Sequence, residues 1–84
     1  MLEAKIHVTL KKSVLDPQGD TVRGALASLG FQGVSDCRIG KFMVLRLSER
    51  DPAKAKVQVD EMCRKLLANP VIEDYVFQIS EVAG

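Results

Sequence analysis

The pair Asp-Pro occurs twice in this chain, at Asp16-Pro17 and Asp51-Pro52, and each pair follows a segment of alternating apolar residues. An aspartate accepts hydrogen bonds from the free amides at a helix start, and proline suits the first helical position because it has no N–H to satisfy. Each pair therefore predicts a helix that begins just after a strand. The apolar residues that follow at helical spacing are Val22, Ala25, Leu26 and Leu29, then Ala55, Val59, Met62, Cys63 and Leu66.

Glycine, asparagine and proline mark the ends of these helices. Gly30 is expected to end the first helix with a positive φ, while Asn69 and Pro70 end the second. Strict alternation predicts a strand at each end of the chain, with the inward residues Ala4, Ile6, Val8 and Leu10 in the first and Tyr75, Phe77 and Ile79 in the last.

The middle of the chain, residues 34–49, alternates again and is interrupted once, at Gly40-Lys41. We expect strands over 35–39 and 42–48 joined by a tight turn, with Gly40 supplying a positive φ. One long strand with a glycine bulge is the alternative. The order β-α-β-β-α-β predicts an α+β fold, a ferredoxin-like two-layer sandwich with both helices on one face of an antiparallel sheet, forming a single domain over 1–84.

The strand over 42–48 is apolar on both faces. Met43, Leu45 and Leu47 form the face turned to the helices, yet Phe42 and Val44 lie opposite. A sheet covered on one side only is expected to be polar on the other, and the chain contains no third helix. Phe42 and Val44 are therefore candidates for self-association.

The composition narrows the classes of partner. Hydrophobic residues make up 46% and charged residues 27% of the 84 residues, and the net charge is +1, so a globular domain is expected and nucleic acid is a poor partner. The strand that starts at Lys41-Phe42 also lacks the aromatic and glycine spacing of RNA-recognition sheets. The apolar runs are too short for a membrane span, and the first ten residues do not form a signal peptide. A cytoplasmic protein is expected.

The sequence contains few candidates for a catalytic residue. His7 lies on the polar face of the first strand, and Cys37 and Cys63 fall at inward positions typical of small core residues. Glu73 and Asp74 are adjacent in a strand and so point to opposite faces, which argues against a paired acid and base. No phosphate-binding glycine motif is present. We expect no catalytic residue, cofactor or metal ligand in this chain.

Two loops are better candidates for binding a partner or a ligand. Arg38 and Lys41 lie on either side of Gly40, and Asp36 shares the face of Arg38. An exposed hairpin ion pair and a basic projection that docks on a partner both fit this pattern. At Asp16, capping of the helix is a simpler explanation than an anion site at the helix N-terminus.

Three blocks of the sequence resemble the PurS family, the small subunit of phosphoribosylformylglycinamidine synthase. Residues 14–19 read VLDPQG, residues 36–41 read DCRIGK and residues 66–75 read LLANPVIEDY. The resemblance extends in order over nearly the whole chain. Cys37 departs from it, since family members usually have an aliphatic residue there, which supports a core role for this thiol.

The resemblance implies a non-catalytic subunit that bridges two partners and commonly forms a dimer. A glutaminase subunit would release ammonia, and a large synthetase subunit, which uses ATP and magnesium, would convert formylglycinamide ribonucleotide into the amidine. Ammonia loses its nucleophilic lone pair when water protonates it, so such a complex must shelter its path. The residues expected to contact the partners are Asp16, Gln18, Asp36, Arg38, Gly40, Lys41, Asn69 and Asp74.

Two other classes share the same order of elements. An ACT-like regulatory module would need a glycine at the first strand-to-helix turn, where Gly19 stands, although Gly19 falls inside the helix start. An acylphosphatase-like enzyme would need a glycine-flanked first loop with a phosphate-holding arginine, which this chain lacks. The ACT-like module is the alternative to the assembly subunit.

Overall fold

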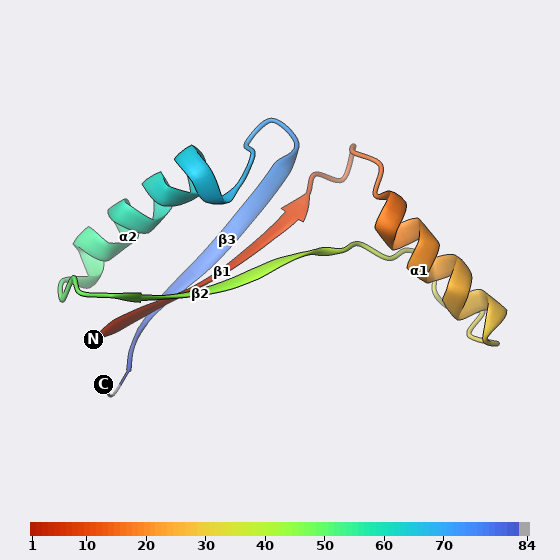
Figure 1. The fold of residues 1–84 in the computed structure, drawn as a ribbon, viewed down its shortest axis with the longest axis horizontal. Coiled ribbons are helices and arrows are strands. Elements are labelled where there is room, and N and C mark those ends of the chain that lie inside the picture. The colour runs from red at the N-terminus through yellow and green to blue at the C-terminus, as the bar shows by residue number, and fades with distance from the viewer. Residues whose placement is uncertain (83–84) are drawn as a thin grey trace.

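A computed structural model describes residues 1–82 of the chain. The elements are strand β1 (Leu2–Leu10), helix α1 (Pro17–Ser28), strand β2 (Gly40–Leu47), helix α2 (Pro52–Met62), the π-helical turn η1 (Cys63–Leu67) and strand β3 (Glu73–Glu81) (Figure 1). The α+β class is thus confirmed. No helix within residues 1–82 is both long and apolar enough to cross a membrane.

The three strands form one antiparallel sheet in the order β2-β1-β3. Ile6 in the central strand lies opposite Met43 on one side and Phe77 on the other, so these three side chains share a face. Both β2 and β3 are edge strands, and each has one side that no strand of residues 1–82 pairs with.

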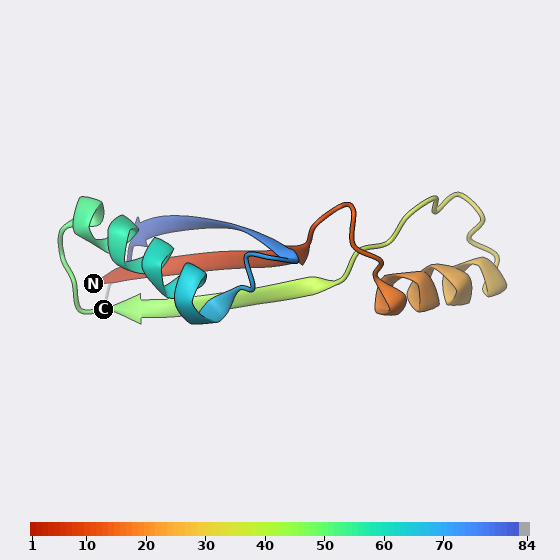
Figure 2. The ribbon, with the colours of Figure 1, turned by 90° about the horizontal axis from the view of Figure 1, so that it is seen from above.

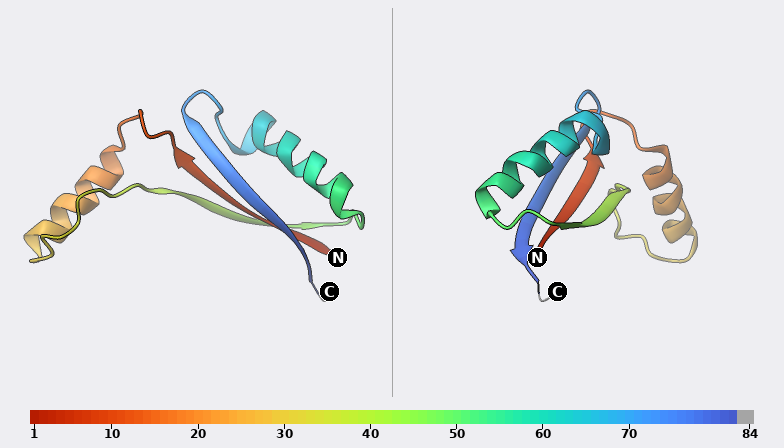
Figure 3. Two further views of the ribbon diagram at one scale, coloured as in Figure 1. Left: turned by 180° about the vertical axis from the view of Figure 1, so that it is seen from behind. Right: turned by 60° about the vertical axis from the view of Figure 1, so that its left-hand side comes forward.

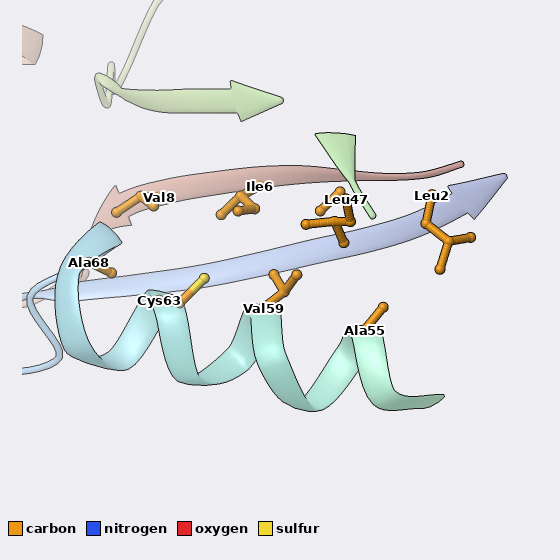
Figure 4. Close-up of a cluster of buried hydrophobic side chains, with 9 residues drawn as sticks. Leu2, Ile6, Val8, Leu47, Ala55, Val59, Cys63 and Ala68 are labelled. Atoms are coloured by element: carbon orange, nitrogen blue, oxygen red, sulfur yellow. The ribbon is translucent and has the colours of Figure 1, made fainter. Parts of the chain in front are cut away.

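Helix α2 covers one face of this sheet and buries the core. Val59 of α2 and Cys63 of η1 point toward Ile6 and Val8 of β1 (Figure 4), and all four side chains are fully buried. The inward alternation predicted for the first strand is confirmed. Of the stripe predicted for the second helix, Ala55, Val59 and Cys63 are buried, whereas Met62 and Leu66 are 37% and 82% exposed, so the prediction is wrong for these two residues. The complete buried apolar set is Leu2, Ala4, Ile6, Val8, Leu47, Ala55, Val59, Cys63 and Ala68.

Helix α1 starts and ends as expected but lies away from the sheet. Asp16 caps its first turn, and Gly30 follows its last turn with a φ of 99°. The helix projects past the end of the strands (Figures 1 and 2), and its apolar residues Val22 and Leu29 are 38% and 73% exposed. The prediction that both helices lie on one face of the sheet therefore holds within this chain only for α2.

The predicted hairpin at Gly40-Lys41 is wrong. Residues 35–39 run extended without strand pairing, and Gly40 is the first residue of β2, opposite Thr9. Gly30 is the one glycine with positive φ in the described part of the chain. The physical reason is a close approach, since a Cβ on Gly40 would overlap the carbonyl oxygen of Val8. The single long strand weighed as the alternative is nearer to the observed path.

The second helix also ends differently from the prediction. Its last turn widens into η1, and the Ala68 amide donates to the carbonyl of Cys63 at 2.9 Å. Asn69 lies beyond this end and its side chain accepts from the amide of Val71 at 3.1 Å, so it shapes the following turn rather than capping the helix.

The outer face of the sheet has no helix on it among residues 1–82. Phe42, Val44 and Val76 are 54%, 48% and 67% exposed there, as the two-faced apolar strand predicted. The ring of His7 stacks on Phe42 with 4.6 Å between centroids. At the far end of the sheet the Val82 amide donates to the carbonyl of Met1 at 2.9 Å, which brings the end of β3 beside the start of β1 (Figure 3).

Candidate functional site: the base of the helical arm

Residues 11–39, which contain α1 and the extended return to β2, form an arm that leaves the sheet at the end of β1. Asp16 is buried at the base of this arm. One of its carboxylate oxygens accepts from the Gly19 amide at 2.9 Å, and the other accepts from the Ile39 amide at 2.8 Å. These two amides, with the charge of Arg38, lower the pKa of Asp16 below its ordinary value. One side chain thus caps α1 and fastens the returning chain to it.

Arg38 holds the segment that leads from β1 into α1. Its Nη2 donates to the carbonyl oxygens of Lys11 at 2.7 Å and Val14 at 2.9 Å, with that of Leu10 at 3.4 Å. The exposed ion pair with Asp36, one of the two interpretations of this loop, is absent among the described contacts, and Asp36 accepts from the Cys37 amide at 3.0 Å. Nη2 of the guanidinium is therefore bound to its own chain.

Two glycines allow the backbones to meet at this base. A Cβ on Gly19 would overlap the carbonyl oxygen of Cys37, so only glycine fits in the first turn of α1. Gly40 makes the corresponding approach to the end of β1. The arm is consequently fixed at both of its connections by close backbone contact and by hydrogen bonds.

A cavity of about 270 Å³ lies between the arm base and the start of β3. Asp16, Gln18, Gly40 and Lys41 are among its lining residues, so four of the predicted partner-contact residues meet here. The ammonium of Lys41 lies 3.8 Å from the carboxylate of Glu73, which also lines the cavity.

The remaining predicted contact residues lie around the same end of the sheet. Asp74 pairs with Lys11 at 3.0 Å, on the opposite face of β3 from Glu73 as the alternation predicted. Asn69 lies in the loop before β3, where its amide donates to Glu73 at 2.7 Å. Asp36 is exposed on the return segment of the arm.

Cys63 and Tyr75 are among the groups outside the arm whose pKa is shifted. Burial raises the pKa of the Cys63 thiol, which suits a core residue. Tyr75 donates to Asp60 at 2.6 Å, and this hydrogen bond raises the pKa of the phenol. Both groups join α2 and η1 to the sheet. The described residues contain no cluster of three or more metal-ligating side chains.

Sequence reasoning missed several partners in the arm base. The carbonyls of Leu10, Lys11 and Val14 leave no mark in the sequence, so the engagement of Arg38 was not foreseen. Gly19 was the one residue whose type pointed to this contact. A glycine in a helix lowers its stability, so a glycine there indicates that another backbone approaches closely.

Fold and site together define a class of protein: a small α+β assembly module. Its polar groups fix the position of an arm, while a helix stripe and a sheet face stay open to other chains. The family described as PurS, phosphoribosylformylglycinamidine (FGAM) synthase, matches residues 3–81. The chain belongs to the PurS family, which confirms the resemblance of the three sequence blocks, whereas nothing supports the ACT-like alternative.

Individual relatives agree with this assignment. The PurS subunit of phosphoribosylformylglycinamidine synthase from Bacillus subtilis is 51% identical over 84 residues, covering 100% of this chain and 99% of the relative. Methanocaldococcus jannaschii PurS, solved as one of the subunits of formylglycinamide ribonucleotide amidotransferase, is 41% identical with a TM-score of 0.88, over 99% and 100% of the two chains. A chain of the Thermotoga maritima PurLQS structure is 30% identical with a TM-score of 0.83, over 95% and 99%.

Proposed function

We propose that this chain is the non-catalytic subunit of a phosphoribosylformylglycinamidine synthase and joins its glutaminase and synthetase subunits. The observation that carries the proposal is the likeness, over 95% of the chain, to a protomer of the Thermotoga maritima PurLQS structure. In this role the chain needs no cofactor of its own, and ATP and magnesium act on the synthetase subunit. The complex would work in the cytoplasm.

The chemistry of the arm base supports an assembly role. Asp16 and Arg38 are the obvious charged pair of a reactive site, yet both carboxylate oxygens of Asp16 and Nη2 of Arg38 are hydrogen-bonded to backbone groups of this chain. A guanidinium whose Nη2 is held by backbone carbonyls offers less of its fork to a phosphate. What such a base does well is keep α1 and the loops beside it in one orientation for partners to contact.

The partner contacts are proposed for the polar side chains around this end of the sheet. Gln18, Asp36 and Lys41 are exposed, and Asn69 and Asp74 lie in or next to the loop before β3. Charges at the rim of an interface mainly tune association rate and orientation. Asp16, Arg38 and Gly40 support these contacts by holding the arm, in addition to any contact of their own.

Self-association is the second part of the proposal. Phe42 and Val44 are half-exposed on the open face of β2, where a homodimer would bury them. A dimer presents every partner-contact surface twice. This suits a subunit that must touch two different enzymes.

Reconstitution with the glutaminase and synthetase subunits tests the assembly role. Amidine formation with glutamine as nitrogen donor is expected to require this chain, whereas a high concentration of added ammonia supports the synthetase without the transfer path. The Lys41→Ala/Asp74→Ala variant should lower the glutamine-dependent rate more than the ammonia-dependent rate. Equal loss of both rates with assembly intact would place these residues at the synthetase chemistry instead, and turnover by the isolated chain would overturn the non-catalytic role.

A further inference from the structure

The turn between η1 and β3, residues 69–72, is held in one conformation by its own hydrogen bonds. The amide of Ile72 donates to the carbonyl of Asn69 at 3.1 Å, and the amide of Val71 donates to the Asn69 side chain at 3.1 Å. Pro70 lies second in the turn, a position that suits its fixed φ. Because the asparagine and the proline both restrict the backbone, the turn keeps one shape although its residues are exposed.

Glu73 fastens this turn to the sheet. Its backbone amide donates to the Asn69 carbonyl at 2.7 Å, and its carboxylate accepts from the Asn69 amide at 2.7 Å. The amide of Lys11, just after β1, donates to the carbonyl of Ile72 at 2.8 Å, so the turn is also held from the central strand. A turn fixed in this way loses little conformational freedom when another molecule binds it, which favours binding.

The turn presents apolar side chains to solvent. Val71 is 79% exposed and Ile72 is 39% exposed. Leu15, in the segment that leads from β1 into α1 at the same end of the sheet, is 81% exposed (Figure 1). Folding of the chain leaves these side chains in water, whereas the centre of a protein interface is apolar and closely packed. A fixed turn with an apolar tip therefore has the form of an interface centre.

Charged side chains lie around the turn, and lysines are in excess among them. The ammonium of Lys11 is hydrogen-bonded to Asp74 at 3.0 Å and is thus already occupied. The ammonium of Lys41 lies 3.8 Å from the Glu73 carboxylate, which is longer than a hydrogen bond, and its side chain is 59% exposed. Lys12 forms no ion pair with any residue of the described range 1–82. Lys41 and Lys12 can therefore still donate to a carboxylate of another molecule.

We propose that the 69–72 turn is a preformed docking site for an enzyme subunit of the synthase, an inference that rests on the function proposed above. The partner surface that fits it has an apolar pocket for Val71 and carboxylates beside that pocket for Lys41 and Lys12. A second copy of the chain fits less well, because two such turns that met about a two-fold axis would bring lysines against lysines. The occupant is therefore a different chain with an acidic rim.

Glu73 is a positioning residue in this site. Its side chain is only 16% exposed, so it acts on the partner through the groups that it holds. One carboxylate oxygen fixes the turn through Asn69, and the other lies beside the ammonium of Lys41 on β2. A single side chain thereby sets the distance between the apolar tip and the nearest free cation.

Titration of this chain into fixed amounts of the glutaminase and synthetase subunits tests the docking site. The measured quantities are the chain concentration that gives half of the maximal glutamine-dependent rate, and the maximal rate itself. Val71→Asp is expected to raise the half-maximal concentration about tenfold or more, because it puts a carboxylate into an apolar pocket beside other carboxylates. The rate at saturation should not change. Val57→Asp, at a 67% exposed position of α2, is the matched control and should change neither quantity.

Two substitutions of Glu73 test its positioning role. Glu73→Ala releases both the turn and Lys41, so it should raise the half-maximal concentration by a similar factor. Glu73→Gln keeps an acceptor for the Asn69 amide and removes only the charge beside Lys41, so it should recover most of the binding. Equal losses in the two variants, with both folded as judged by circular dichroism, would overturn the positioning of the turn by Glu73.

The other outcomes separate this inference from the proposed function. An unchanged half-maximal concentration for Val71→Asp would overturn the docking site, and a lower maximal rate alone would place the turn at the chemistry instead. Smaller species in sedimentation of the isolated Val71→Asp chain, compared with the unchanged chain, would assign the turn to a contact between copies and overturn the different partner. No stimulation of the glutamine-dependent rate by the unchanged chain would overturn the proposed function, and this inference with it.

Discussion

At the scale of single residues, Asp16 decides how the arm is held. Its two carboxylate oxygens join the helix start to the return segment, and the amides of Ile39 and Gly19 lower its pKa. A carboxyl whose folded pKa lies below its unfolded value contributes stability above the unfolded pKa, near 4, and loses it as the pH falls through the folded pKa.

Asp16→Ala is therefore expected to lower the free energy of unfolding at pH 7 and to have progressively less effect as the pH falls below about 4. Urea unfolding at several pH values measures the difference from the unchanged protein. Asp20→Ala, in the same helical turn but exposed, is the control. A difference that stays constant from pH 7 down to pH 2 would contradict the role given to the ionised carboxylate.

Gly19 and Gly24 form a matched pair within α1. A Cβ on Gly19 meets the carbonyl of Cys37, while a Cβ on Gly24 has no described atom within 4 Å. Gly19→Ala should destabilise the protein by roughly 1–3 kcal/mol through overpacking. Gly24→Ala should stabilise it by up to about 1 kcal/mol, since alanine favours the helix. Thermal unfolding of both variants measures this, and equal effects would show that the arm is not held at Gly19.

At the scale of elements, α2 covers the sheet whereas α1 lies in the arm, although both helices follow an Asp-Pro pair and have an apolar stripe. The difference lies in the connections. The turn into α2 leads back over β1 and β3, whereas the bonds of Arg38 direct the chain outward before α1 begins.

The covering role of α2 gives a direct prediction. Val59 is fully buried and Val57, on the same helix, is 67% exposed. Val59→Ala should lower the free energy of unfolding by about 1–3 kcal/mol because it removes buried methyl groups and leaves a cavity. Val57→Ala should change it by less than about 0.5 kcal/mol. Chemical denaturation distinguishes them, and similar losses would mean that the exposed side of α2 is also packed.

Much of this element structure was predictable. The caps at Asp16 and Asp51, the end of α1 at Gly30 and the inward faces of β1 and β3 are local, so residue spacing contains them. The path of the chain around Gly40 was not predictable. A glycine can be required either by a positive φ or by the close approach of another backbone, and only the position of Val8 in the structure shows that close approach is the reason here. Helical spacing likewise predicts a stripe on α1 without indicating whether the sheet of the same chain lies against it.

In the candidate site too, some features were predictable from the sequence and others were not. Asp16, Gln18, Gly40 and Lys41 were predicted as separate loop residues, and the structure brings them to one cavity. Arg38 was predicted to face a partner, yet its bonds are to backbone carbonyls, which every residue has and no sequence pattern distinguishes.

At the scale of the whole molecule, this chain is elongated, measuring 48 by 30 by 15 Å, and it exposes apolar surface on the outer face of the sheet and on α1. A domain of this size buries a limited share of its surface when folded alone. The self-association proposed above would bury more of this surface and add to the stability, so the melting temperature should rise with protein concentration.

Phe42→Asp tests that dependence. A charge on the open face of β2 should weaken self-association at least tenfold, about 1.4 kcal/mol, and abolish the rise of melting temperature with concentration. Val57→Asp, an equally polar change on an exposed part of α2, is the control. Analytical ultracentrifugation gives the dissociation constants, and an unchanged constant for Phe42→Asp would leave this face in water.

Because Val82 contacts Met1, the same fold does not require the chain to start at Met1. A short glycine-rich linker from Val82 back to Met1 would close the polypeptide into a ring. The ring could then be cut elsewhere, for instance between Glu49 and Arg50 in the loop before α2. Such a circular permutant should keep the same circular dichroism spectrum and the same partners, since ends that lie together usually tolerate joining. A permutant cut between Gln32 and Gly33, at the tip of the arm, would break the covalent link between α1 and the extended segment behind it. If this permutant still self-associates, α1 and that segment do not need the link in order to act together.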